Sequence, residues 1–334
     1  MTRPKVVLWR PMYDQHGHEL LIAGGAEIAV VDSADPAALK SLLPGARALY
    51  VRTPERLTAE LLDAGAELIV VSTSGFGTDN IDIPAATARG ILVVNHRGFG
   101  RVPVAEHTIL LILAAAKDLV AGDAGTRDST AWQGRTEKPY FELEGKTVGL
   151  VGLGHIGAEL ARKLTLGFRC RVLAHDPYVD PRLPPAVGAE LMGSLDEMLR
   201  QSKVLCLVPE LTDETRNLIG ARELALLPPG AVVVNTGRGQ VLDLEALAAA
   251  LDRGHLLAAG LDVVYPEPLR PGHPLLKHPR IAFTPHIAGM TVEATRRLAQ
   301  SAAEQILAAL SGGMPRFPVN PEAWTQGRSR RPAP

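Results

Sequence analysis

The chain has 334 residues, more than one hydrophobic core usually supports, so two domains are expected. Its 35 basic and 36 acidic side chains leave a formal net charge of −1, which argues against nucleic-acid or membrane partners held by overall charge. The two cysteines, Cys170 and Cys206, are too few for a disulfide framework or a cysteine metal site; with an N-terminus that lacks a signal-peptide pattern, they indicate a cytoplasmic protein.

The first part of the chain, residues 1–102, alternates short β-branched runs with amphipathic segments. This alternation is typical of parallel sheets whose strands are connected by helices. Helices are expected at residues 58–64 and 84–88, and the spacing His16-Gly17-His18, with no third ligand nearby, is interpreted as a loop without metal. The expected strands are residues 5–9, 27–31, 48–51, 67–72 and 91–95.

The middle of the chain begins with a long apolar segment that predicts a helix over residues 104–120. A polar, glycine-rich arm is expected over residues 121–139. A second alternating series then starts at Thr147, and its regular spacing fits the strand–helix units of a doubly wound sheet. Its expected strands are residues 147–151, 171–175, 204–208, 231–235, 258–263 and 281–284.

The last predicted helix, residues 292–310, has no strand after it and is expected to return to the first domain. The fold class is therefore α/β with two doubly wound parallel-sheet domains. A Rossmann dinucleotide-binding domain (103–288) is inserted in a flavodoxin-like substrate domain (1–102, completed by 289–322). Residues 323–334 are polar and are expected to form a disordered tail.

A G-x-G-x-x-G pattern lies between the strand expected at 147–151 and a predicted helix. Gly152 permits a tight turn, Gly154 lets the backbone approach a pyrophosphate, and Gly157 lets helix and strand pack closely. Asp176 ends the next expected strand, where a carboxylate accepts hydrogen bonds from the adenosine ribose and repels a 2′-phosphate, so NAD is favoured over NADP. A tight turn beside an unrelated acidic residue is the alternative interpretation.

Polar residues follow three expected strands of the second sheet: Arg238, Glu267 and His286. Ligands of open α/β sheets bind beyond the carboxyl ends of the strands, so these side chains are expected to converge. Reduction of a 2-oxo acid needs a proton donor, which His286 supplies, and a carboxylate such as Glu267 stabilises the imidazolium. The Arg238 guanidinium matches a substrate carboxylate and polarises the carbonyl. Taken singly, each residue also fits a surface or turn position.

With these motifs, the chain resembles the D-isomer-specific 2-hydroxyacid dehydrogenase family over roughly residues 45–322. The resemblance implies that Arg238, Glu267 and His286 form the catalytic triad, that Asp262 holds the nicotinamide carboxamide, and that amides of Ser74–Gly77 bind the substrate carboxylate. It also implies a homodimer built around the long helix and its arm, and D stereochemistry. The matching segments are 75–82, 104–108, 143–157, 212–219, 234–243, 260–268 and 284–289. The candidate cofactor-binding residues are Gly152, Gly154, His155, Ile156, Gly157, Asp176, Thr236 and Asp262, and the candidate substrate-binding residues are Ser74, Gly75, Phe76, Gly77, Arg52 and Arg97.

The chain departs from the family's usual pattern at residues 96–103 and at residues 208–211. In the first segment Gly100 stands where the family has an Asn, and Arg97 and Arg101 are added. Since arginine is the preferred partner of carboxylates and phosphates, Arg97 or Arg101, together with Arg52, is hypothesised to favour a substrate with a second anionic group. The alternative is that these arginines are solvated or pair with Glu106 or Asp79.

Other functions of similar architecture remain open. Phosphite and phosphoglycerate dehydrogenases also fit the Arg, Glu and His set, whereas Glu267 argues against a formate dehydrogenase, which typically has Gln there. A different class is a non-catalytic, NAD-sensing scaffold resembling the C-terminal binding protein corepressors. Turnover of NADH with a panel of 2-oxo acids separates the enzyme from the scaffold.

Overall fold

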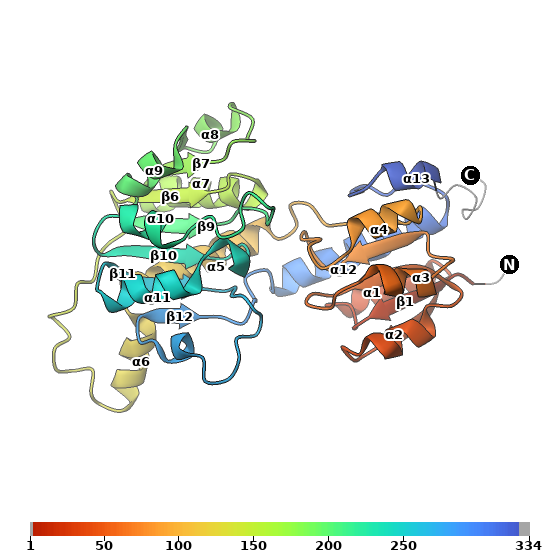
Figure 1. Ribbon diagram of the computed structural model, residues 1–334, viewed down its shortest axis with the longest axis horizontal. Helices are drawn as coiled ribbons and strands as arrows, with labels where there is room; N and C mark the ends of the chain where they lie inside the picture. The colour runs from red at the N-terminus through yellow and green to blue at the C-terminus, as the bar shows by residue number, and fades with distance from the viewer. Residues whose placement is uncertain (1–2, 327–334) are drawn as a thin grey trace. The chain divides into compact units, whose positions relative to one another are not determined.

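The computed structural model describes residues 3–326, which form two compact units (Figure 1). One unit contains the described residues up to Gly100 and from Met290 onward, and the other contains Arg101–Gly289. Within residues 3–326, no helix combines the length and apolar character needed to cross a membrane.

The first unit is a five-stranded parallel sheet in the order β2-β1-β3-β4-β5. This is the flavodoxin-like order, in which the direction of winding reverses between β1 and β3. Strand β1 shows why the sheet has helices on both faces: Val7 and Trp9 belong to one buried cluster, and Val6 and Leu8 to another. The strands are β1 (Lys5–Trp9), β2 (Glu27–Val31), β3 (Ala46–Val51), β4 (Val70–Thr73) and β5 (Leu92–Val94).

Helix α12 (Val292–Leu310) packs against α1 (Gln15–Ala23) and strands β3 and β4 of the first unit. Figure 1 shows the blue α12 alongside the red α1, although almost the whole chain separates them in sequence. Small apolar residues of α12, among them Ala299, Ala302 and Ala303, are buried in this packing. The other helices of the unit are α2 (Pro36–Leu42), α3 (Ala59–Ala64), α4 (Ile83–Ala88) and α13 (Glu322–Gln326).

The second unit is a seven-stranded parallel sheet in the order β12-β11-β10-β9-β6-β7-β8. Counted from β6, the order is that of a Rossmann sheet with a seventh strand, and the winding reverses between β6 and β9. The predicted fold class is therefore confirmed for both sheets. The strands are β6 (Thr147–Val151), β7 (Arg171–His175), β8 (Ala189–Leu191), β9 (Val204–Leu207), β10 (Ala231–Asn235), β11 (Leu256–Leu261) and β12 (Ile281–Phe283).

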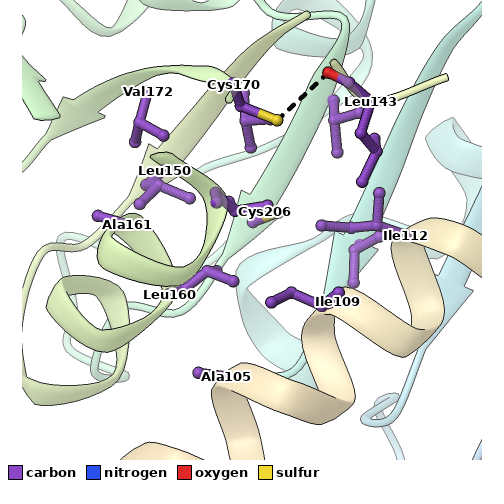
Figure 2. Close-up of a cluster of buried hydrophobic side chains, with 14 of the residues drawn as sticks. Ala105, Ile109, Ile112, Leu143, Leu150, Leu160, Ala161, Cys170, Val172 and Cys206 are labelled. Atoms are coloured by element: carbon purple, nitrogen blue, oxygen red, sulfur yellow. Dashed lines mark hydrogen bonds between the residues drawn. The ribbon is translucent and has the colours of Figure 1, made fainter. Parts of the chain in front are cut away.

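Helix α5 (Arg101–Ala116) crosses the second sheet at β10 and β11 and packs against α7 (His155–Phe168). Figure 2 shows Ile109 and Ile112 of α5 in one buried cluster with Leu160 of α7 and both cysteines. The Cys170 thiol donates to Leu143 O at 3.3 Å, and burial raises the pKa of both thiols, so they act as small buried apolar groups. The remaining helices are α6 (Leu119–Arg127), α8 (Leu183–Ala186), α9 (Leu195–Gln201), α10 (Ala221–Leu226) and α11 (Leu244–Asp252), with short 3-10 turns η1 (Gly239–Val241) and η2 (Pro274–Lys277).

Several local predictions are wrong. The helix expected over 104–120 ends at Ala116, because Asp118 adopts a left-handed conformation with φ +51°, and α6 then occupies the start of the expected arm. The His16-Gly17-His18 segment lies inside α1, where Gly17 packs closely against Met12 and Ala299. Residues 322–326 form α13, with Ala323 buried, although disorder was expected from 323; residues 327–334 of that expected tail lie outside the described residues.

Candidate active site

The glycine-rich loop of the second unit connects β6 to α7. Gly152 has φ +91°, which favours glycine, and a Cβ on Gly157 would lie 2.3 Å from Gly152 O, so only glycine fits there. Gly154 is the N-cap of α7, is exposed, and has open space where its Cβ would project. The loop is therefore tightly packed toward the protein and open toward solvent at Gly154.

The open side of this loop fits a diphosphate. The amides at the start of α7, including those of His155 and Ile156, have no acceptor within the helix and mark its positive end. No side chain caps the helix, so nothing competes with an anion at this point. The residues present thus fit the dinucleotide that the sequence pattern predicts.

Asp176 lies directly after β7, beside the glycine-rich loop. Its Oδ2 accepts from Leu153 N at 2.8 Å and its Oδ1 from Tyr178 N at 3.0 Å. These bonds fix the carboxylate against the loop, and each oxygen retains a further lone pair. The half-buried carboxylate can therefore accept from a diol while remaining anchored.

The loop after β9 closes against the same glycines. A Cβ on Gly152 would lie 2.9 Å from Pro209 Cα, so Pro209 contacts the glycine-rich loop. The contact lies where the winding of the sheet reverses, between β6 and β9. Dinucleotides bind at such a reversal in open α/β sheets.

Arg238 is positioned by the buried side chain of Asn235, the last residue of β10. Asn235 Nδ2 donates to Arg238 O at 3.0 Å and Asn235 Oδ1 accepts from Gly237 N at 3.1 Å, which fixes the turn from both sides. A Cβ on Gly239 would lie 2.1 Å from Val264 O, so the Arg238 turn packs directly on the loop that carries Glu267. The guanidinium is half-buried, and its Nη1 donates to Gly237 O at 3.0 Å.

Glu267 and His286 form a side-chain hydrogen bond, with Oε2 and Nδ1 2.8 Å apart. Both side chains remain partly accessible, at 31% and 37% of their surfaces. The backbone of His286 has φ +55°, a left-handed conformation that costs a non-glycine residue roughly 1–2 kcal/mol. The His286 amide, which donates to Asp262 O at 2.9 Å, helps to hold this conformation.

The carboxylate of Asp262 is fully engaged with the loop that carries His286. Its Oδ1 accepts from Thr284 Oγ1 at 2.6 Å and from Ile287 N at 2.9 Å, and its Oδ2 accepts from Ala288 N at 3.0 Å. The residue is 2% exposed. The structure therefore places Asp262 behind the His286 loop, where it fixes the turn.

Helix α5 makes hydrogen bonds to residues that follow β10 and β12 at this edge of the sheet. Thr108 Oγ1 and Thr236 Oγ1 are 2.7 Å apart, so the hydroxyl of Thr236 faces α5. His107 Nε2 lies 2.9 Å from Thr284 Oγ1. Sequence patterns alone do not reveal these supporting roles, because each bond joins residues more than 120 positions apart.

In the first unit, the Ser74–Gly77 loop follows β4. Ser74 is buried, and its Oγ accepts from Tyr13 Oη and from Thr53 N, each at 3.4 Å. The Arg52 guanidinium stacks on the Tyr13 ring at 4.3 Å, and its Nε is buried without a partner. The structure thus groups Arg52 with the loop of the candidate substrate residues.

The added arginines lie at different places. Arg97 is exposed, and Arg101 begins α5 and lies 3.9 Å from Glu159. The Glu106 carboxylate, an expected partner, instead pairs with Lys163 at 3.1 Å. Within residues 3–326, no group of three or more His, Cys, Asp or Glu side chains is placed to hold a metal ion.

Comparisons with known proteins agree with this geometry. Residues 109–288 match the family model described as D-isomer specific 2-hydroxyacid dehydrogenase, NAD binding domain. The chain is 38% identical over 330 residues to the glyoxylate reductase of Aeropyrum pernix, covering 96% of this chain and 97% of that relative. It is 41% identical over 286 residues to the D-3-phosphoglycerate dehydrogenase of Mycobacterium tuberculosis, covering 86% of this chain and 53% of the relative, so the chain spans about half the length of that protein.

A solved structure shows that this similarity to known proteins extends to the fold. The holo form of Rhodotorula graminis D-mandelate dehydrogenase superposes with a TM-score of 0.86 at 28% identity, covering 96% of this chain and 98% of that one. By sequence and by fold, the chain belongs to the D-isomer specific 2-hydroxyacid dehydrogenase family.

Proposed function

We propose that the chain is an NAD-dependent oxidoreductase that transfers a hydride between nicotinamide and C2 of a small D-2-hydroxy or 2-oxo acid. The observation that carries this proposal is the 2.8 Å pair of His286 and Glu267, at the carboxyl edge of the sheet that also carries the glycine-rich loop. The Arg238 turn packs on the Glu267 loop through Gly239, which brings a guanidinium to the same edge. Bound NAD supplies or accepts the hydride.

The acid–base role follows from the tautomer that the pair requires. A carboxylate only accepts hydrogen bonds, so Nδ1 of His286 carries the proton shared with Glu267. Nε2 of a neutral ring is then an acceptor, which takes the hydroxyl proton when a 2-hydroxy acid is oxidised. In the opposite direction the protonated ring donates from Nε2 to the carbonyl oxygen, and the Glu267 carboxylate stabilises its charge.

Substrate binding is proposed to use two kinds of donor. The planar fork of Arg238 matches a carboxylate and polarises the adjacent carbonyl. The amides of the Ser74–Gly77 loop are proposed to bind the carboxylate as an anion nest. Both groups recognise the part of the molecule that all 2-oxo acids share.

A second anionic group on the substrate is favoured by Arg52. Its guanidinium stacks on Tyr13, whose hydroxyl donates to Ser74, and the buried Nε has no acceptor among the described residues. The exposed Arg97 is proposed as a further contact. We therefore propose dicarboxylic or phosphorylated 2-oxo acids as the preferred substrates. The alternative activity is the oxidation of phosphoglycerate, the compound in the name of one relative.

The test is NADH oxidation by the full chain with glyoxylate, a dicarboxylic 2-oxo acid and a phosphorylated 2-oxo acid. We expect turnover of all three, with the lowest KM for a substrate that carries a second anion. Arg52→Ala should remove that preference, whereas Arg101→Ala, the matched control, should not. NADH binding without turnover of any 2-oxo acid would contradict the proposed activity.

A homodimer is proposed through the outer surface of α5, α6 and the segment that follows. Leu110, Leu119 and Trp132 are exposed there, at 49%, 54% and 60%. Next to α5, Ile109, Leu166 and Phe168 line an apolar groove. Exposed apolar surface of this extent on neighbouring elements is typical of a contact between subunits.

A further inference from the structure

Two carbonyl groups of the Ser74–Gly77 loop, those of Gly75 and Phe76, accept hydrogen bonds from the first unit. Gly75 O accepts from Thr73 Oγ1 at 2.6 Å and from His96 N at 3.0 Å, and Phe76 O accepts from Asn95 Nδ2 at 2.9 Å. In a planar trans peptide the N–H of the next residue points opposite to the carbonyl. The amides of Phe76 and Gly77 therefore point away from these partners, and neither has an acceptor among the described residues.

The ring of His96 connects the end of β4, directly before this loop, to α12. His96 is completely buried, with Nε2 3.0 Å from Thr73 O and Nδ1 2.9 Å from Ser301 Oγ. A carbonyl oxygen only accepts, so Nε2 carries the proton and Nδ1 is the acceptor. One neutral ring thus bonds the end of β4 on one side and α12 on the other.

The α12 side of the ring is fixed by Gln305. Its Oε1 accepts from Phe317 N at 2.8 Å, so its Nε2 is the donor that bonds Asn95 O at 2.9 Å and faces His96 Nδ1 at 3.3 Å. A proton on Nδ1 would face this N–H group, which is a donor and cannot accept a hydrogen bond. The geometry therefore requires the neutral tautomer, and burial lowers the pKa of His96 to about 4.

We infer that His96 is a positioning residue, whose neutral ring ties Thr73, the residue that leads into the Ser74–Gly77 loop, to α12 and so keeps the amides of Phe76 and Gly77 directed at the substrate carboxylate. The inference rests on the proposed use of that loop as the carboxylate site.

Two substitutions test the hydrogen bonds at Nε2 and at Nδ1 of His96 separately. In His96→Gln the amide nitrogen reaches the position of Nε2 and keeps the donor to Thr73 O. In His96→Asn the shorter amide keeps an acceptor for Ser301 and loses the bond to Thr73 O. We expect Asn to raise the KM for glyoxylate about tenfold, the effect of roughly one lost hydrogen bond, with kcat and NADH affinity within about threefold. Gln keeps the bond to Thr73 O but loses the acceptor for Ser301, so it should raise the KM about threefold, clearly less than Asn.

Hydrogen exchange at the Gly75 amide, which donates to Thr73 Oγ1 at 3.4 Å, gives a second readout that does not depend on turnover. The Asn variant should exchange faster there, and the Gln variant should match the wild type. His255→Asn, which removes a 3.1 Å bond between His255 Nε2 and Leu224 O in the second unit, is the matched control and should change neither the KM nor this exchange.

Equal KM values and equal exchange in the Asn and Gln variants would overturn the inference. If the Asn variant does not fold, Ser301→Ala removes one bond to Nδ1 and leaves the ring in place; it should raise the KM about threefold, and an unchanged KM would count equally against the inference. A wild-type chain that turns over no 2-oxo acid would contradict the proposed function instead, and the exchange comparison would still decide the role of His96.

Discussion

The imidazole of His286 is held at two points, its backbone by Asp262 O and its Nδ1 by Glu267. This double attachment leaves Nε2 as the ring atom available for proton transfer. If His286 is the proposed proton-transfer group, it needs no reorganisation when the substrate binds, which favours a fast chemical step.

Glu267→Gln removes the charge partner of a protonated His286 and keeps the shape of the side chain. We expect kcat for 2-oxo acid reduction to fall about 10- to 100-fold, with NADH binding retained. Because the protonated ring loses its stabilising carboxylate, the decline of the reduction rate on the alkaline side should move to lower pH. A pH–rate profile with the wild-type shape would remove Glu267 from the mechanism.

Arg238→Ala removes the guanidinium from the same edge. The expected loss of kcat/KM is about 10²- to 10³-fold, since an aligned charge at the reacting oxygen is lost. Arg238→Lys should recover little, because an ammonium lacks the planar fork. NADH affinity from fluorescence titration is the control, and a similar loss there would indicate a structural role.

Asp176→Ser tests the cofactor preference. The wild-type carboxylate repels a 2′-phosphate, so the substitution should lower the KM for NADPH and raise the KM for NADH. The ratio of the two kcat/KM values is expected to shift by about tenfold or more, and an unchanged ratio would exclude Asp176 from the choice of cofactor.

Because His96 is buried, the free energy of unfolding should depend on pH. Its folded pKa of about 4 lies below the ordinary value of 6.5, and the groups that contact its ring atoms (Ser72, Thr73, Ser301, Gln305 and Phe99) are uncharged. The neutral ring therefore stabilises the fold above pH 6.5, and this stability is lost as the pH falls toward 4. Between pH 7 and pH 4.5 the wild type should lose about 2–3 kcal/mol more than His96→Gln in urea unfolding. Parallel losses in the two proteins would contradict this.

At the scale of elements, the sequence predicted most of both sheets because the strands are short, apolar runs buried on both faces. Strand β8 was not expected, since Ala189-Glu190-Leu191 is a short edge strand with a charged centre. The break between α5 and α6 was also missed, because it depends on one left-handed residue, Asp118, rather than on apolar periodicity.

Some residues of the candidate site could likewise be predicted from the sequence, and others could not. Arg238, Glu267 and His286 could be named because each follows a strand end, and sheet topology brings strand ends together. The roles of Asn235 and Thr108 could not be named, because a supporting hydrogen bond depends on side-chain positions that only the packed structure fixes.

Asp262→Asn tests how one side chain controls the His286 loop. The carboxylate accepts three hydrogen bonds, from Thr284, Ile287 and Ala288, and an amide would turn an N–H group toward one of these donors. We expect a loss of about 2 kcal/mol or more in unfolding free energy, together with a lower kcat. Asp252→Asn, on a side chain that is 71% exposed, should change stability by less than about 0.5 kcal/mol; similar effects of the two variants would refute the assigned role.

At the scale of the whole molecule, the proposed dimer makes the outer surface of α5 sensitive to charge. Leu110→Glu should convert the dimer to a monomer in sedimentation experiments, because it introduces a carboxylate into an apolar contact. Ile22→Glu on α1, at a side chain that is 60% exposed, should leave the assembly unchanged. A wild-type monomer at micromolar concentration would refute the dimer.

Because α12 packs against α1, the first unit is completed only late in synthesis. The first unit contains residues from both ends of the chain, whereas Arg101–Gly289 is continuous. At about 5–20 residues per second, the ribosome needs on the order of 10–40 s to proceed from residue 100 to the end of α12. Throughout that interval Val6, Leu8 and Tyr50 lack the helix that covers them, so the nascent N-terminal sheet is a natural client for chaperones until the last helix emerges.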